Sequence, residues 1–210
     1  MSSNQASLVV SQLRSIRGDR ELFRDVGFTL EGGEVLQIHG ANGSGKTTIL
    51  RILAGLTRPD AGEIRWQGQL VSEDWRPYLA ELRYIGHLSG IKLELSPMEN
   101  LRFAPGLLGP ARAMPLEQAL DEVALYGFED EPARTLSAGQ RRRIALARLL
   151  VSPGRLWLLD EPHTSLDKAG MAMLQGLMHR HLESGGLIIL ASHNPLELKE
   201  QHIRSLQLVT

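Results

Sequence analysis

A glycine-rich segment has the residue types and spacing needed to bind phosphate. It reads GANGSGKTT and matches the pattern G-x-x-x-x-G-K-[ST]. Its glycines let the backbone curl so that several N–H groups face one anion, and the start of the following helix adds its dipole. We expect Lys46 to reach the β- and γ-phosphates of a nucleotide and the Thr47 hydroxyl to bind Mg²⁺. The residues of this predicted phosphate loop are Gly40, Ala41, Asn42, Gly43, Ser44, Gly45, Lys46, Thr47 and Thr48.

Two adjacent carboxylates end an apolar run, LWLLDEP, at residues 156–162. Ligands of open α/β sheets bind at the carboxyl ends of the strands. We therefore expect Asp160 to complete the Mg²⁺ shell, and Glu161 to orient and deprotonate an attacking water. Asp-Glu-Pro is also common in turns, so an acidic strand end that caps the next helix is the alternative. The phosphate loop in the same chain favours the catalytic interpretation.

A second turn of small residues, LSAGQ, precedes a basic run with helical apolar periodicity. Ser137 and Gln140 have the spacing of a capping box, so the turn predicts a helix start. Such a turn also presents N–H groups and the positive end of a helix dipole, which suit a phosphate. One nucleotide cannot comfortably use two such turns from one compact chain. A second copy of the chain could supply the second turn.

Alternating strand and helix patterns must position these residues. We expect strands at 8–13, 28–30, 35–39, 63–67, 83–87, 156–160, 187–192 and 203–209. We expect helices at 46–54, 97–102, 115–126, 138–151, 166–182 and 195–201. This order predicts an α/β fold with a mainly parallel sheet and a small antiparallel lobe formed by the early strands. We predict one domain, in which residues 1–87 and 152–210 form a nucleotide-binding core and residues 88–151 form a helical subdomain.

The composition excludes several classes of protein. With 210 residues, 42% of them hydrophobic, the chain is long enough to bury a sizeable core. A formal net charge of −1 gives no electrostatic footprint for bulk nucleic-acid binding. The absence of cysteine rules out disulfides, thiolate metal sites and cysteine nucleophiles. There is no signal-peptide pattern and no apolar stretch near the ~18 residues of a membrane span, so we expect a cytosolic protein with peripheral membrane contact.

Five motifs in order resemble those of the ATP-binding-cassette (ABC) ATPases. LSAGQ follows the phosphate loop, with Ala138 where the family's signature motif usually has glycine. The Asp-Glu strand end, TSLD at 164–167 and His193 after an apolar run complete the order. The resemblance covers nearly the whole chain. It implies the phosphate-loop NTPase fold, the cofactors ATP and Mg²⁺, and a head-to-tail homodimer that holds two ATP molecules.

The resemblance also assigns roles to residues outside the phosphate loop. Ser137, Gly139 and Gln140 of one copy would grip the γ-phosphate of the ATP bound to the other. The region of Asp167 would couple the two sites, and His193 would hydrogen-bond the γ-phosphate. By residue type alone, a single histidine at a strand end is more often a surface residue, and Asp167 more often a solvated residue at a helix start.

Two positions depart from the family pattern. The family usually has a glutamine between core and helical subdomain that touches Mg²⁺ and the attacking water. Counting back from MEN at 98–100 places His87 there, and a neutral histidine can make one of those hydrogen bonds at a time. The alternative is that His87 only ends a strand. Arg17 stands where the family often stacks an aromatic on adenine, and since a guanidinium stacks less selectively, we expect relaxed base discrimination.

Several segments resemble one subfamily, the ATP-binding subunits of bacterial cytochrome c maturation systems. They are 58–69, 84–101, 136–149 and 156–162. This resemblance implies an ATPase docked on integral membrane permease subunits at the cytoplasmic face of the bacterial inner membrane, with heme-handling partners and no nucleic acid. The alternatives are an ABC ATPase for another substrate, a soluble cassette protein of the DNA-repair or translation type, and a phosphotransferase. Near-neutral charge and the lack of a long coiled coil argue against the second, and the LSAGQ turn argues against the third.

Overall fold

The structure is a computed structural model, and it describes residues 7–106, 114–152, 154–192 and 203–208. The chain divides into two compact units. The core unit comprises residues 1–84, 155–161 and 179–210, and the helical unit comprises residues 85–154 and 162–178. This division groups residues 162–178 with the helical unit, whereas the sequence interpretation grouped them with the core. The predicted subdomain boundaries stay a prediction.

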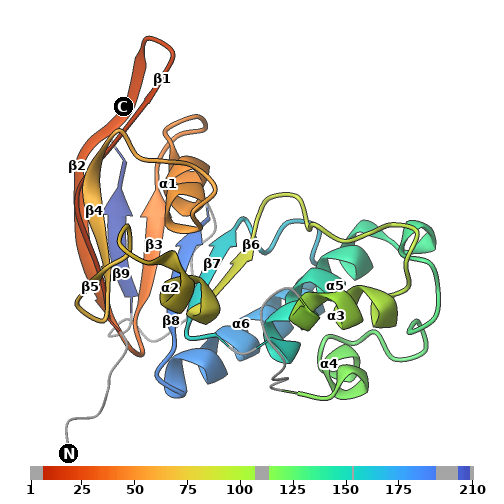
Figure 1. The fold of residues 1–210 in the computed structure, drawn as a ribbon. Helices are drawn as coiled ribbons and strands as arrows, with labels where there is room; N and C mark the ends of the chain where they lie inside the picture. Colours follow the sequence, from red (N-terminus) through yellow and green to blue (C-terminus); the bar gives the residue numbers. More distant parts are fainter. Residues whose placement is uncertain (1–6, 107–113, 153, 193–202, 209–210) are drawn as a thin grey trace, which may run out of the picture. The chain divides into compact units, whose positions relative to one another are not determined.

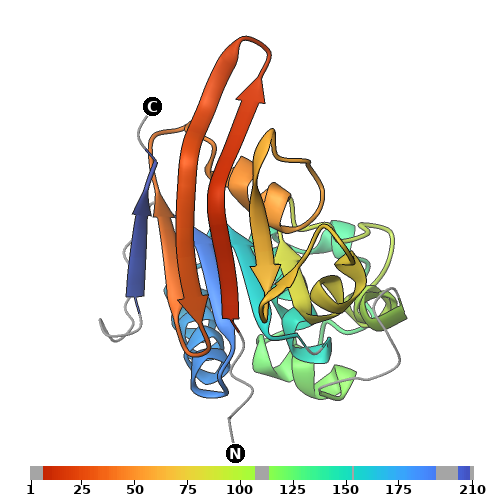
Figure 2. The same ribbon diagram turned by 60° about the vertical axis from the view of Figure 1, so that its left-hand side comes forward.

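Two sheets build the core unit (Figures 1 and 2). The first has the order β2-β1-β4-β5 and is antiparallel. The second has the order β6-β7-β8-β3-β9, in which β3 pairs in parallel with β8 and β9, and β7 with β8. The strands are β1 (Ser7–Arg17), β2 (Arg20–Glu31), β3 (Val35–His39), β4 (Ala61–Trp66), β5 (Gln69–Leu70), β6 (Leu82–Ile85), β7 (Leu156–Asp160), β8 (Leu187–Ala191) and β9 (Ile203–Gln207). The predicted α/β fold with an antiparallel lobe is therefore confirmed.

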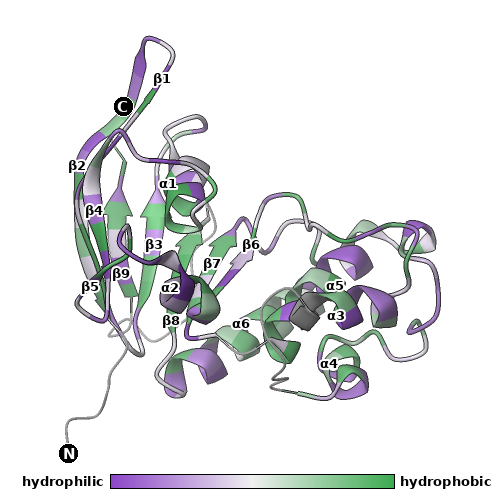
Figure 3. Cartoon of the chain, viewed as in Figure 1, coloured by the Kyte–Doolittle hydropathy of each residue, from purple (hydrophilic) through white to green (hydrophobic). Residues whose placement is uncertain are grey.

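Residue patterns explain the two kinds of strand. β7 and β8 read LWLLD and LIILA and are buried at every position, as expected for parallel strands covered on both faces. In Figure 3 the two strands are correspondingly hydrophobic along most of their length. The start of β1 instead alternates between buried and partly exposed residues, as expected for an antiparallel strand with one covered face.

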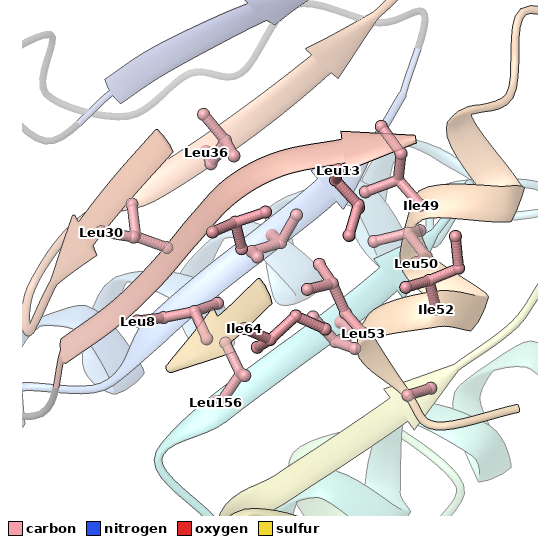
Figure 4. Packing of buried hydrophobic residues seen from close by; sticks show 14 of the residues in the cluster. Leu8, Leu13, Leu30, Leu36, Ile49, Leu50, Ile52, Leu53, Ile64 and Leu156 are labelled. Carbon is pink, nitrogen blue, oxygen red and sulfur yellow. The ribbon is translucent and has the colours of Figure 1, made fainter. Parts of the chain in front are cut away.

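Helix α1 (Lys46–Leu53) is anchored in the hydrophobic core of the core unit. Ile49, Leu50, Ile52 and Leu53 are fully buried, and Figure 4 shows them among Leu13, Ile64 and other residues of the two sheets. Complete burial of a side chain of this size stabilises a fold by about 2 kcal/mol. Because the phosphate loop continues directly into α1, this packing fixes the position of the loop.

The helical unit is built around α5 (Ala138–Val151), which contacts α3 (Pro97–Gly106) and α4 (Leu116–Glu122). The short helix η1 (Ala133–Thr135) precedes α5, and α6 (Lys168–Glu183) begins in this unit and ends in the core unit. No helix in the described part of the chain is long and apolar enough to cross a membrane.

Several predicted boundaries were wrong. The strands predicted at 8–13 and 28–30 are the longer β1 and β2, because the two pair along a hairpin as far as Arg17 and Arg20. β6 ends at Ile85, before Gly86, and α4 ends at Glu122. The short helix α2 (Trp75–Glu81) was not predicted, although Asp74 caps it by accepting a hydrogen bond from Arg76 N–H. The helix predicted at 195–201 lies outside the described residues.

Candidate nucleotide-binding site

The phosphate loop joins β3 to α1 within the core unit. Gly43 and Gly45 have φ angles of +78° and +101°, a region that residues with a Cβ rarely adopt. A Cβ on Gly45 would also lie 2.8 Å from Cδ1 of Phe23. Gly45 is the N-cap of α1, so the loop delivers the chain to the helix start in a conformation that requires glycine.

The Lys46 ammonium is held against its own loop. Nζ donates hydrogen bonds of 2.7 Å to the carbonyl of Gly40 and 3.0 Å to the carbonyl of Ala41, and the residue is only 9% exposed. An ammonium has three donors, so the third can be given to a phosphate oxygen. The structure thus places the Lys46 charge at the loop, and its contact with the β- and γ-phosphates stays a prediction.

Ser44 supplies a buried hydroxyl within the loop. Its Oγ has no hydrogen-bond partner among the described residues, and a Cβ on Gly40 would collide with it. Buried polar atoms are nearly always hydrogen-bonded, so an orphaned hydroxyl in this loop fits a site that is completed by a polar ligand. A phosphate oxygen is such a ligand.

Asp160 and Glu161 stand where β7 ends. Asp160 is 2% exposed. The pKa of Tyr84 is raised, mainly by burial of the Tyr84 side chain and secondly by the charge of Asp160. Glu161 N–H donates a 2.9 Å hydrogen bond to the Ala191 carbonyl at the end of β8. Glu161 has a φ of +48°, a strained conformation that costs about 1 kcal/mol or more and is concentrated at functional sites. The Glu161 carboxylate therefore leaves the end of the strand on a fixed, strained backbone.

Within the described residues there is no group of three or more His, Cys, Asp or Glu that could hold a metal ion. Mg²⁺ is usually bound by one or two carboxylates or hydroxyls together with substrate phosphates and water. A buried Asp160 and the Thr47 hydroxyl at the start of α1, both in the core unit, are a donor set of this kind.

The remaining predicted residues of the core unit are less informative. Arg17 is an exposed residue at the end of β1, and it pairs with Arg20 across the hairpin. The role of Arg17 in base stacking stays a prediction. His193 lies outside the described residues.

The LSAGQ turn is a capping box in the helical unit, as its spacing predicted. Gln140 N–H donates to Ser137 Oγ at 3.1 Å, and Ser137 N–H donates to Gln140 Oε1 at 2.9 Å. Both side chains accept in these bonds, so the Ser137 O–H and the Gln140 NH₂ group keep their donors. The helix start and the phosphate-binding interpretation are therefore compatible.

Gly139 is required by a close tertiary approach. A Cβ on Gly139 would lie 2.8 Å from the carbonyl oxygen of Ser165. Ser165 itself has a φ of +68°, so the TSLD segment bends sharply where it passes the turn. The small residue at this signature position is thus explained by packing.

Asp167 holds two helices together within the helical unit. Its Oδ1 accepts a 2.8 Å hydrogen bond from Gly170 N–H in the first turn of α6 and a 3.0 Å hydrogen bond from Arg143 Nη2 of α5. These bonds hold the pKa of Asp167 below its usual value, and the bond from Gly170 has the larger effect. The predicted helix-start role is confirmed, while coupling between two ATP sites stays a prediction.

His87 lies two residues after the end of β6, is exposed and belongs to the helical unit. Sequence reasoning missed Arg142 and Arg143, because three consecutive arginines resemble a solvated basic face. The structure instead buries Arg142, which is 4% exposed, and pairs Arg143 with Asp167. The available signal was the apolar periodicity of α5, because Arg142 lies one helical turn before the buried residues Ala145 and Leu146.

The fold and the loop geometry define a phosphate-loop nucleotide-binding protein. A family model described as "ABC transporter" matches residues 23–164. The chain is 48% identical, over 93% of its length and 95% of the relative's, to the "Cytochrome c biogenesis ATP-binding export protein CcmA" of Methylococcus capsulatus. It is 46% identical to the protein of the same name from Escherichia coli K12, over 96% of both chains. The chain therefore belongs to the ABC transporter family of ATP-binding proteins.

A solved structure agrees with this assignment at the level of the fold. The ATP-binding subunit of an ABC transporter superposes with a TM-score of 0.82 at 23% sequence identity, over 96% of this chain and 87% of that one.

Proposed function

We propose that the chain is the ATP-hydrolysing subunit of a membrane export complex for cytochrome c biogenesis, acting in heme export or heme-chaperone release. The observation that carries the ATPase part is the phosphate loop, in which glycine geometry, the Lys46 ammonium and the orphaned Ser44 hydroxyl meet at the start of α1. The export part rests on relatives named as cytochrome c biogenesis export proteins, at 46% to 48% identity over nearly the whole chain.

Hydrolysis proceeds by in-line attack of water on the γ-phosphate. The N–H groups of the loop and Lys46 bind the phosphates, and Glu161 orients the water and accepts its proton. Thr47 and Asp160 would hold Mg²⁺, which would supply positive charge to neutralise the β- and γ-phosphates. His87 and His193 complete the hydrogen bonds around the γ-phosphate and the metal shell, and Arg17 stacks on the base.

The reaction needs a second copy of the chain. Ser137, Gly139 and Gln140 of the partner copy donate hydrogen bonds to the γ-phosphate, and Asp167 transmits the state of one site to the other. The capping box supports this role, because it fixes both side chains through their acceptor atoms and leaves their donors for a ligand. The homodimer docks on integral membrane permease subunits at the cytoplasmic face of the bacterial inner membrane.

The test is a pull-down of tagged Glu161→Gln protein from mildly solubilised membranes, with the Lys46→Ala variant as control. We expect permease subunits to co-purify together with a Soret absorbance band from heme, more strongly with Glu161→Gln than with Lys46→Ala. A different permease without the heme band would keep the ATPase assignment and overturn the cytochrome c role. Recovery of no membrane partner would overturn the transporter assignment.

A further inference from the structure

Arg142 is a buried arginine on α5, two residues after the LSAGQ turn, and it is 4% exposed. Its Nε donates a 3.0 Å hydrogen bond to the carbonyl of Pro162, and its Nη1 donates a 3.0 Å hydrogen bond to the carbonyl of Gly86. All three residues belong to the helical unit. One guanidinium therefore joins the signature helix to two backbone segments that are distant from it in sequence.

The two carbonyls stand at special points of the chain. The chain leaves the core unit after Tyr84 and again after Glu161, so Gly86 and Pro162 lie just inside the helical unit at these crossings. Gly86 directly precedes His87, and Pro162 directly follows Glu161. The Arg142 side chain thus attaches both Gly86 and Pro162 to α5. These two residues flank His87 and Glu161, which are proposed to act on the γ-phosphate and the attacking water.

A second arginine of α5 holds the other end of the His87 segment. Arg148 Nη1 donates a 3.2 Å hydrogen bond to the Gly90 carbonyl, and burial lowers the pKa of Arg148. Gly90 has a φ of +63°, so the chain turns sharply there. Residues 87–89 are therefore bracketed by two arginine–carbonyl hydrogen bonds that originate from one helix.

The chemistry of arginine suits this role. A guanidinium is planar, stays charged and directs five N–H donors in a fixed fork, so it can reach two separate carbonyls without changing its rotamer. A lysine ammonium is a point charge and cannot reproduce that fork. A buried charge is tolerated only where hydrogen bonds replace its lost hydration, so Arg142 has a strong reason to keep both carbonyls in place.

We propose that Arg142 is a positioning residue that makes the His87 segment, the residue after Glu161 and the signature turn move as one body. A displacement imposed on the His87 segment then shifts the LSAGQ turn and the chain beyond Glu161 together. The effect of this inference on hydrolysis rests on the proposed ATPase function. The two hydrogen bonds from Arg142 to the carbonyls of Gly86 and Pro162, called the Arg142 clamp below, can be tested without measuring activity.

The first experiment compares hydrogen exchange in Arg142→Gln, wild type and the control Arg141→Gln, all as full-length protein. Arg141 is adjacent on α5 and partly exposed, and its substitution removes the same charge. We expect amides of residues 87–90 and 163–166 to exchange about tenfold faster in Arg142→Gln and at the wild-type rate in Arg141→Gln. Unchanged exchange at both segments in Arg142→Gln would overturn the clamp.

The second experiment separates positioning from a general structural role. We expect Arg142→Gln to lower kcat about tenfold with the KM for ATP unchanged. The phosphate loop that binds ATP lies in the core unit and keeps its structure, whereas the segments that Arg142 positions in the helical unit are misaligned. Arg142→Lys keeps the charge and the buried stem, so it preserves the fold even if the glutamine variant does not, and we expect the same loss of kcat. A wild-type kcat in Arg142→Lys would overturn the positioning role. So would a loss of ATP binding in the Arg142 variants that accompanies a fall in their melting temperature. If wild-type protein in its complex hydrolyses no ATP, the proposed function fails, while the exchange data still decide on the clamp.

Discussion

The two glycine turns of this protein lie at the starts of two helices and are built in opposite ways. In the phosphate loop the backbone creates the site: Gly43 and Gly45 take conformations that other residues avoid, and the buried Lys46 is tied to loop carbonyls. In the LSAGQ turn side chains fix the conformation, through the reciprocal hydrogen bonds of Ser137 and Gln140. The difference teaches that a helix start can be shaped either by the curl of its glycines or by side chains that cap it.

The glycines of the two turns are also required for different reasons. Gly45 is needed for its φ of +101°, which follows from the path of its own loop. Gly139 is needed because the Ser165 carbonyl passes 2.8 Å from where its Cβ would be, which follows from a neighbouring segment. Substitutions in the two turns should therefore fail in different ways.

The largest effect is expected for Lys46→Ala in the phosphate loop. Removing the ammonium eliminates the charge that we expect to bind the β- and γ-phosphates, so ATP affinity should fall about 100-fold or more and turnover should be lost. Isothermal titration with Mg-ATP and a phosphate-release assay measure both quantities. Persisting turnover would contradict the loop assignment.

A smaller loss is expected for Glu161→Gln. Glutamine keeps the shape but cannot accept the proton, so kcat should fall about 10²- to 10⁴-fold while ATP binding is retained. Size-exclusion chromatography with ATP should show a stabilised dimer. Near-wild-type hydrolysis would refute the assignment of Glu161 as the base. The matched control is Glu73→Gln, because Glu73 is an exposed carboxylate of the core unit.

The Gly139→Ala variant separates the two turns most directly. Its Cβ would press on the Ser165 carbonyl, so the turn and the TSLD segment must shift, and we expect kcat to fall about tenfold because misplaced groups lose catalytic alignment. Nucleotide binding by the monomer should be unchanged, since the phosphate loop is separate. The control Ala138→Gly should retain activity. Equal loss of nucleotide binding in Gly139→Ala would show that the two turns are not independent.

A modest pH effect is expected in the core unit and not in either turn. His181 stacks on Trp157 at 3.8 Å between ring centroids, and its Nε2–H donates to the Arg155 carbonyl at 3.1 Å. Burial lowers the pKa of His181 to about 4. The unfolded chain, with a His pKa of about 6.5, binds this proton first, so the stabilisation is complete above about pH 6.5 and is lost as the pH falls towards 4.

Melting curves between about pH 7.5 and 4.5, which cover most of that range, test the assignment. We expect His181→Phe, which retains a ring beside Trp157, to show a smaller fall in melting temperature than wild type over this range. His179→Phe serves as the control, because His179 is 44% exposed and pairs with Glu183 at the surface. An identical pH dependence in His181→Phe and wild type would contradict the assignment.

The smallest effect concerns base selectivity. If Arg17 stacks on the nucleobase, GTP should compete with ATP within about a few fold, since a guanidinium stacks on any base. The variant Arg17→Tyr should widen the difference. Strong discrimination by the wild-type protein would rule out relaxed selectivity.

The sequence by itself determined the features that depend on neighbouring residues. The phosphate loop could be read from its pattern, the strands Leu156–Asp160 and Val35–His39 from their apolar runs, and the helix Ala138–Val151 from its capping box, all with the observed bounds. These features depend on backbone conformation and on hydrogen bonds that span only a few residues. Contiguous sequence records such interactions directly.

Only the tertiary structure decided the features that depend on distant residues. The burial of Arg142 against Gly86 and Pro162, the Arg143–Asp167 ion pair and the approach of Ser165 to Gly139 join segments separated by about 20 residues or more. Three adjacent arginines have the same local pattern whether they are solvated or buried. Which of them enters the interior is determined by the chain that folds over the helix, and that information is not present in the helix itself.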